Sequence, residues 1–184
     1  MSAPRLRRQP FYCEENVWHL CQEPTLAARR REVVFVSNPE RACPMWHQKA
    51  GRGKPIVWDY HVVLLVADPL EIWDVDTTLG LPLAARDWMR GSFHPGVPPP
   101  YLPSFRIVPA DLYVEALASD RSHMRLPDGS FRAPPPPWGP IGRPGAPSNL
   151  MSFVDMTRPF LGEVLSLPAF AARIGGSHPL YQVG

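Results

Sequence analysis

The stretch PIVWDYHVVLLVADPLEIWDVDTTL, residues 55–79, carries the strongest β-strand signal in the chain. β-Branched and aromatic residues dominate it, and an Ala-Asp-Pro turn at residues 67–69 divides it in two. It therefore predicts two consecutive strands that pair with each other. A second apolar run, EVVFVSN at residues 32–38, predicts another buried strand, which ends at the Asn38-Pro39 step.

Short helical patterns lie around these strands. The first begins at Cys13, where apolar residues recur at positions i+4, i+7 and i+8, and Pro24 limits it. Glu14 and Glu15 suit its first turn, because carboxylates are stabilised at the positive end of the helix dipole. Three more short helices are expected within residues 110–118, 148–156 and 166–174, the last one after a short strand at 163–165.

The sequence predicts further details for each of these three later helices. In the helix of residues 110–118, Leu112, Ala116 and Leu117 are expected on the apolar side. The last helix has Ser166 as its expected N-cap, since a serine hydroxyl can accept a bond from a free N–H of the first turn. Ser148 or Asn149 is expected to cap the helix between them.

The order of these elements predicts a single α+β domain: a central, largely antiparallel sheet flanked by helices. A length of 184 residues suits one domain with a real core. Many of the 25 prolines fall at residues 94–103 and 133–147, so both stretches are expected as extended loops. Residues 1–10 are basic with no apolar run behind them, which predicts a flexible arm before a domain of residues 11–184.

The composition argues against several classes of protein. A net charge of +2 is too small to imply a nucleic-acid or membrane partner, and the run YHVVLLVA is too short to span a bilayer. Three cysteines without a CxxC pair make a poor disulfide framework and a poor zinc site. We therefore expect a reduced, cytoplasmic protein, also nuclear if eukaryotic, without a metal. A monomer is expected because no heptads or self-complementary apolar stripe are present.

Cys13 stands where a thiol can become a nucleophile. A helix N-terminus and a neighbouring imidazolium both lower the pKa of a thiol from about 8.5. The adjacent Glu14 and Glu15 act in the opposite direction, so a histidine partner is required. The candidate is His61, a polar residue inside an otherwise apolar strand. The alternative is that Cys13 is an ordinary core residue and His61 a structural one.

Carboxylates that can orient His61 are available in the same stretch. Asp59 shares a strand face with His61, and Asp74 and Asp76 share a face of the next strand, because side chains alternate along a strand. Together with Cys13 they supply a nucleophile, a base and an orienting acid. Papain-like and transglutaminase-like enzymes use the same set of roles.

The pairing register decides which carboxylate meets the histidine. A four-residue connection at 66–69 places His61 directly opposite Asp74, with Cβ atoms about 4.5–5.5 Å apart. A connection at 68–71 places it opposite Thr78 instead. The residues alone leave both registers open.

Five separated blocks resemble, in order and spacing, the motifs of the protein N-terminal glutamine amidohydrolase family. They are YCEENVWHLC (12–21), VWDYHVVLL (57–65), IWDVDTTL (72–79), ASDRSHM (118–124) and FRAPPPPW (131–138). The resemblance runs from about residue 11 to about residue 175. It implies deamidation of an N-terminal glutamine side chain on a protein or peptide, and a papain- or transglutaminase-like core. In eukaryotes this step feeds the arginylation branch of the N-degron pathway.

The resemblance also assigns roles to residues. The family's Cys-His-Asp triad falls on Cys13, His61 and Asp74, in agreement with the register that pairs His61 with Asp74. It implies that the Cys13 thiolate attacks the glutamine δ-carboxamide, that backbone N–H groups hold the oxyanion, and that water hydrolyses a thioester after ammonia departs. No metal or organic cofactor is needed.

Only the free α-ammonium distinguishes an N-terminal glutamine from an internal one, so an acid is expected one glutamine length from the sulfur. Ser122 or His123 is a candidate to line the substrate cleft, the alternative being a loop knitted by its own hydrogen bonds. Two other functions compete: another acyl-transfer enzyme, either a peptidase or a transglutaminase, and a non-catalytic module that binds N-terminal residues. The candidate acids for the ammonium are Glu14, Asp59, Asp76 and Asp120.

Overall fold

The computed structural model describes residues 6–175 and has one six-stranded sheet in the order β6-β5-β4-β1-β7-β8. All neighbouring strands are antiparallel. The sheet consists of β1 (Arg31–Ser37), β4 (His61–Val66), β5 (Glu71–Trp73), β6 (Leu83–Ala84), β7 (Ser104–Pro109) and β8 (Glu163–Ser166). The strands β2 (Cys43–Met45) and β3 (Ile56–Trp58) form a separate pair.

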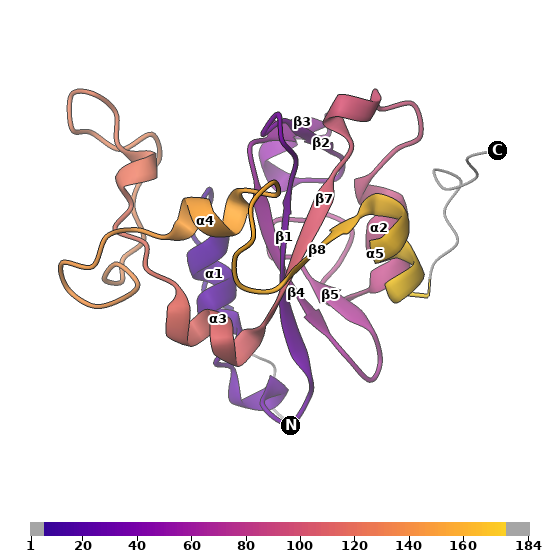
Figure 1. Cartoon of the computed structure of the whole chain (residues 1–184), viewed down its shortest axis with the longest axis horizontal. Helices are drawn as coiled ribbons and strands as arrows, with labels where there is room; N and C mark the ends of the chain where they lie inside the picture. Colours follow the sequence, from indigo (N-terminus) through magenta and orange to yellow (C-terminus); the bar gives the residue numbers. More distant parts are fainter. Residues whose placement is uncertain (1–5, 176–184) are drawn as a thin grey trace.

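Helices cover both faces of the sheet (Figure 1). One face carries α1 (Cys13–Leu20), α3 (Ala110–Ala116) and α4 (Leu150–Val154), and the other carries α2 (Ala85–Ser92) and α5 (Leu167–Arg173). Four 3-10 turns complete the elements: η1 (Pro24–Leu26), η2 (Lys49–Gly51), η3 (Pro99–Tyr101) and η4 (Ser122–Met124). The predicted single α+β domain with a flanked antiparallel sheet is confirmed; the papain-like core stays a prediction.

The central strands read as unbroken apolar runs because both of their faces are covered. In β1, Val33 and Phe35 belong to the core under α1, α3 and α4. Val34 and Val36 belong to the core under α2 and α5. Successive side chains point to opposite faces of a strand, so a strand buried on both sides needs apolar residues at every position.

The decisive stretch 55–79 departs from its predicted form in two ways. Its first half contains β3 and β4, which lie in different sheets, and its second half contributes only the three residues of β5. The register pairs Leu65 with Ile72 and Val66 with Glu71, so both predicted registers are wrong. The observed connection is residues 67–70, one residue later than the connection at 66–69 with which the family resemblance agreed.

A side chain from outside the hairpin holds this connection. Arg29 donates to the carbonyls of Ala67 and Pro69 and to the carboxylate of Glu71, at 2.7–2.9 Å. Local sequence gives no sign of this contact, because Arg29 lies before β1, far from the hairpin in the chain. The observed connection is therefore supported by a tertiary interaction in addition to its own turn residues.

Several elements were missed or misjudged. The strand β7 and the helix α2 were not predicted. In β7, Arg106 is buried and donates to the backbone carbonyls of Phe153, Asp155, Arg158 and Leu161. In α3, Leu112 is 37% exposed, and the buried side is formed by Ala110 and Tyr113, followed by Leu117. The prediction that Leu112 lies on the buried side of this helix is therefore wrong, whereas that for Leu117 is confirmed.

The predicted caps had mixed outcomes. Ser166 caps α5 as predicted, because its side chain accepts from the N–H of Ala169. Asn149 occupies the N-cap position of α4, but its side chain bonds to the backbone of Ala116 and Ala118 instead. It therefore ties α4 to the end of α3 rather than capping its own helix.

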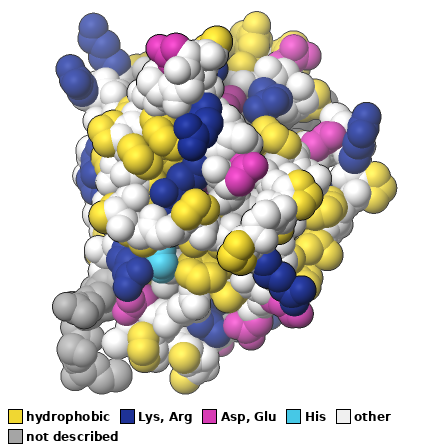
Figure 2. Space-filling model, turned by 90° about the vertical axis from the view of Figure 1, so that its left-hand side faces the viewer, with side chains coloured by type: hydrophobic (Ala, Val, Ile, Leu, Met, Phe, Trp, Pro, Cys, Tyr) yellow, Lys and Arg dark blue, Asp and Glu magenta, His cyan; other side chains and the backbone are white. Residues whose placement is uncertain are grey.

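Two segments outside regular elements, residues 6–10 and 133–147, lie on the α1 side of the molecule. Within 6–10, Arg8 pairs with Asp76, and Gln9 exchanges two hydrogen bonds with Asn16. Residues 133–147 contain no helix or strand, and residues 94–103 contain only η3. On this side of the molecule, hydrophobic, basic and acidic side chains are interspersed (Figure 2). Within residues 6–175, no helix has the length and apolar character needed to cross a bilayer.

Candidate active site

Cys13 is the first residue of α1, and α1 packs against β4. The sulfur lies beside the start of that strand, because the backbone N–H of Val62 hydrogen-bonds to it and so favours the thiolate. His61 is the residue before Val62 and opens β4. The end of a helix and the start of a strand thus bring the predicted nucleophile and base to one place.

Cys13 and His61 line the same cavity, which has a volume of about 580 Å³. One wall is aromatic: Phe11 meets Trp58 edge to face, and Trp58 stacks on the His61 ring with centroids 5.7 Å apart. The remaining wall residues are Arg41, Asp59, Tyr60, Asp76, His123, Met124, Arg132, Ala133 and Met151. An apolar cavity with a few polar groups and a thiol is suited to a small polar side chain.

The predicted contact between His61 and Asp74 is present, with Nε2 3.0 Å from Oδ1. It does not come from the strand ladder, because β5 ends at Trp73 and the chain turns at Asp74. Continuing the ladder would have placed Asp76 opposite His61. The right partner was therefore predicted from the wrong register.

Asp74 is buried and accepts four hydrogen bonds. Its Oδ1 faces His61 and accepts from the backbone N–H of Asp76, while its Oδ2 accepts from Gln48 and from the Trp88 indole, all at 3.0 Å. Burial raises the pKa of Asp74, but the charge and hydrogen bond of His61, with Trp88 and Gln48, lower it to about 2. The carboxylate is therefore ionised and fixed in orientation. Nothing in the local sequence pointed to Gln48 or Trp88.

The two reactive groups have opposite electrostatic surroundings. Burial lowers the pKa of His61, and the charge and hydrogen bond of Asp74, with Asp76, outweigh it and raise that pKa above its ordinary value. Cys13 is 7% exposed, and burial, followed by Glu14, raises the pKa of its thiol well above its ordinary value. The helix N-terminus therefore does not by itself give a resting thiolate, in line with the expectation that the acids beside Cys13 oppose it.

The five candidate substrate-binding residues are not all at the cavity. Asp59 and Asp76 line it, and Asp76 is buried and paired with Arg8 at 2.7 Å. Glu14 is buried behind Cys13 and does not line the cavity. Asp120 and Ser122 also lie outside its lining, and the Asp120 carboxylate accepts from the backbone N–H of Ser122. The neighbouring His123 does line the cavity.

A buried ion pair explains two of the sequence blocks. Arg121 donates to both carboxylate oxygens of Glu15, at 2.7 and 2.8 Å, and the Trp138 indole donates to the same carboxylate at 2.7 Å. The bidentate geometry fixes the planar guanidinium against α1. The ASDRSHM and FRAPPPPW segments are thereby held against the helix that carries Cys13. The sequence analysis did not identify this role.

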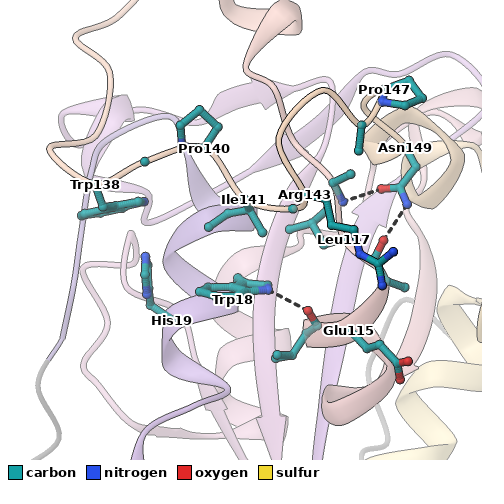
Figure 3. Close-up of a pocket in the computed structure, with 16 residues that line it drawn as sticks. Trp18, His19, Glu115, Leu117, Trp138, Pro140, Ile141, Arg143, Pro147 and Asn149 are labelled. Atoms are coloured by element: carbon teal, nitrogen blue, oxygen red, sulfur yellow. Dashed lines mark hydrogen bonds between the residues drawn. The ribbon is translucent and has the colours of Figure 1, made fainter.

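A second and larger cavity, of about 790 Å³, lies at the other end of α1 (Figure 3). Trp18 and Trp138 each meet His19 edge to face, and Glu115 and Arg143 supply charge. None of Cys13, His61 and Asp74 lines this cavity. The predicted nucleophile and base therefore belong to the smaller cavity. Within residues 6–175, no group of three or more His, Cys, Asp or Glu side chains is arranged to hold a metal.

Comparison with known proteins gives a consistent result. The sequence model of a family described as N-terminal glutamine amidase matches residues 8–174. A protein N-terminal glutamine amidohydrolase of Danio rerio is 39% identical over 175 residues, covering 89% of this chain and 87% of that protein. The Arabidopsis thaliana protein of the same name is 38% identical, covering 85% and 78%, and the Drosophila mojavensis protein is 43% identical, covering 71% and 69%.

Proposed function

This chain belongs to the N-terminal glutamine amidase family, and on that premise we propose that it hydrolyses the side-chain amide of an N-terminal glutamine. The products are N-terminal glutamate and ammonia. One observation carries the proposal for these residues: Cys13 and His61 share a cavity, and the carboxylate of Asp74 holds the Nε2 side of the His61 ring.

The geometry gives each member of the triad one task. With Nε2–H donating to Asp74, the basic nitrogen of His61 is Nδ1. Because the Cys13 thiol is neutral at rest, Nδ1 takes its proton as the sulfur attacks the amide carbon. The negative charge passes to the amide oxygen, where backbone N–H groups stabilise it.

The second half of the reaction returns the enzyme to its starting state. The imidazolium of His61 gives its proton to the departing nitrogen, the C–N bond breaks, and a thioester remains on Cys13. Nδ1 then removes a proton from water, which attacks the thioester carbon. The C–S bond breaks, the sulfur regains the proton, and glutamate leaves. Asp74 stays ionised throughout and stabilises the transient imidazolium.

For recognition of the α-ammonium, the lining supports Asp59 and Asp76 over the other predicted acids. Of these two carboxylates, Asp76 raises the pKa of the Cys13 thiol more than Asp59 does. A glutamine with a free amino group offers a cation to these acids, and an N-acetylated one does not. We expect the acetylated peptide to react much more slowly, and equal rates would contradict this ammonium site.

Mass spectrometry of a Gln-initiated peptide tests the proposal. Deamidation changes the side chain and leaves the peptide whole, whereas a peptidase would shorten it and a transglutaminase would join it to an amine. We expect whole, deamidated peptide with the wild-type protein and no product with Cys13→Ala. Unchanged peptide with the wild-type protein would instead favour a module that binds N-terminal residues without catalysis.

A further inference from the structure

Glu14 presents an unusual carboxyl group directly behind the nucleophile. Its side chain is 0% exposed. Oε2 accepts from the Tyr60 hydroxyl at 3.1 Å, and the Cys13 thiol points at the same oxygen from 3.9 Å. Oε1 has no hydrogen-bond partner among the described residues, and His123 Nε2 lies 3.5 Å from it. A buried carboxylate oxygen without a donor is costly, which calls for an explanation.

The charged and titratable groups around Glu14 do not neutralise it. On α1 its neighbours are Cys13 and Glu15, neither of which can favour a negative charge. Arg121, directly before η4, favours ionisation of Glu14, but its N–H groups bond to Glu15 and to a backbone carbonyl. The other facing groups are Tyr60 before β4, Tyr113 of α3, which donates to the Glu14 carbonyl, and His123.

The balance of these effects agrees with a protonated group. Burial raises the pKa of Glu14, its own backbone N–H opposes the rise, Glu15 adds to it, and the result is about 8. Burial also lowers the pKa of His123, so that ring is neutral at pH 7. Neither partner then brings a charge to the contact between Oε1 and Nε2.

We propose that Glu14 is a positioning residue that works as a neutral carboxylic acid. Its proton sits on Oε1, which faces Nε2 of His123 at 3.5 Å, while Oε2 accepts from Tyr60. The Tyr60 hydroxyl also lies 3.3 Å from the same Nε2, so Glu14 and Tyr60 together position a ring that lines the cavity. No negative charge stands behind the sulfur when the thiolate forms in the proposed reaction, on which this part of the inference rests.

The inference also explains how a nucleophilic thiol tolerates two neighbouring carboxylates. Glu15 faces away into a bidentate pair with Arg121. Glu14 has no such cation and is neutralised by a proton instead. The two adjacent acids of the YCEEN block thus have different roles: one anchors the surrounding segments, and the other holds a proton.

Thermal unfolding tests the protonation without any reference to activity. Glutamine is a close mimic of the neutral acid, since its amide donates on one side and accepts on the other. A raised pKa stabilises the folded wild type fully below pH 4.5, and this stabilisation is lost as pH rises towards 8. We expect the Tm of Glu14→Gln relative to wild type to rise between pH 5 and pH 8.5. A relative Tm that stays level or falls over this range would overturn the proposal, because an already ionised Glu14 does not change its charge between pH 5 and pH 8.5. Glu15→Gln is the matched control on the same turn and is expected to lower the Tm throughout.

The pH profile of kcat/KM tests the positioning role. We expect Glu14→Ala to lose at least about tenfold in kcat/KM at pH 7 and Glu14→Gln to restore most of that loss. The α-ammonium of the peptide loses its proton near pH 8 for every variant, so the readout is the ratio of Glu14→Gln to wild-type kcat/KM, which we expect to rise as pH rises through about 8. If Glu14→Gln is as impaired as Glu14→Ala although both fold, an ionised Glu14 is required and the proposal is wrong. A wild-type protein inactive on Gln-initiated peptides would refute the proposed function, and the Tm series would still decide the state of Glu14.

Discussion

Replacing Asp74 with asparagine removes the charge behind His61 while keeping the size of the side chain. The carboxylate accepts from donors on both of its oxygens: His61 and a backbone N–H on one, Gln48 and Trp88 on the other. An amide has only one acceptor oxygen, so in either orientation two donors face an NH₂ group. The less costly answer is for His61 to change tautomer, which places its proton on Nδ1 and removes the base.

The magnitude follows from the same contacts. After the tautomer change one buried donor, the backbone N–H of Asp76, is left without an acceptor, which predicts a loss in the free energy of unfolding of about 1–3 kcal/mol. Independently, lowering the Asp74 pKa from 3.8 to about 2 corresponds to about 2 kcal/mol of stabilisation. Loss of the correct tautomer predicts a fall in kcat/KM of about 10³–10⁴-fold, the scale known for this substitution in a serine-protease triad.

Two assays check this prediction. Deamidation of a Gln-initiated peptide gives kcat/KM, and urea unfolding gives stability as a function of pH. Because the Asp74 pKa is lowered, its contribution is present above pH 3.8 and is lost as pH falls through about 2, so the stability gap between wild type and Asp74→Asn should narrow in acid. The matched control is Asp87→Asn on the exposed side of α2, whose nearest cations are 3.8 and 3.9 Å away. Asp74→Asn with kcat/KM within tenfold of wild type would refute the reasoning.

Three further substitutions extend the account. Trp88→Phe removes one donor to Asp74 and keeps an aromatic side chain. Urea unfolding should show a loss of about 1–2 kcal/mol, and peptide kinetics a smaller fall in kcat/KM than in Asp74→Asn. An equal fall in kcat/KM would show that the indole does more than orient the acid. Arg8→Gln releases Asp76 from its ion pair and should lower the KM for a Gln-initiated peptide, most clearly at low salt; a raised KM would mean that Arg8 helps to hold the substrate. Phe35→Ala removes a buried ring stacked on Phe153 at 5.2 Å and should cost about 3–5 kcal/mol in urea unfolding, and a loss under 1 kcal/mol would contradict the assigned core.

The strands and helices that the sequence revealed are those whose signal is local. β1, β4 and α1 have apolar patterns long enough to read, and Ser166 caps its helix through residues within three positions. β7 escaped because Arg106 interrupts its apolar run. That arginine is buried only because four carbonyls from residues about 50 positions away accept its hydrogen bonds. A pattern of residue types cannot contain that information.

The site was predictable in its residue types and less so in its geometry. Cys13 and His61 line one cavity and His61 contacts Asp74, as the sequence predicted, but that contact arises where the chain leaves the ladder, not from the predicted register. The supports of that contact, Gln48 and Trp88, lie on other elements and carry no recognisable spacing. Likewise, the effect of burial on the Cys13 thiol depends on how deeply α1 packs, which the helix pattern alone does not give.

The central claim is that Cys13 is the nucleophile of this cavity, and stoichiometric alkylation tests it most directly. Native protein is treated with limiting iodoacetamide, the label is located by peptide mass spectrometry, and the remaining deamidation rate is measured in the same samples. We predict that activity falls in proportion to the fraction of Cys13 that is labelled, with Cys21 and Cys43 unmodified, and that a saturating Gln-initiated peptide slows the labelling. Full labelling of Cys13 with undiminished deamidation would contradict the account.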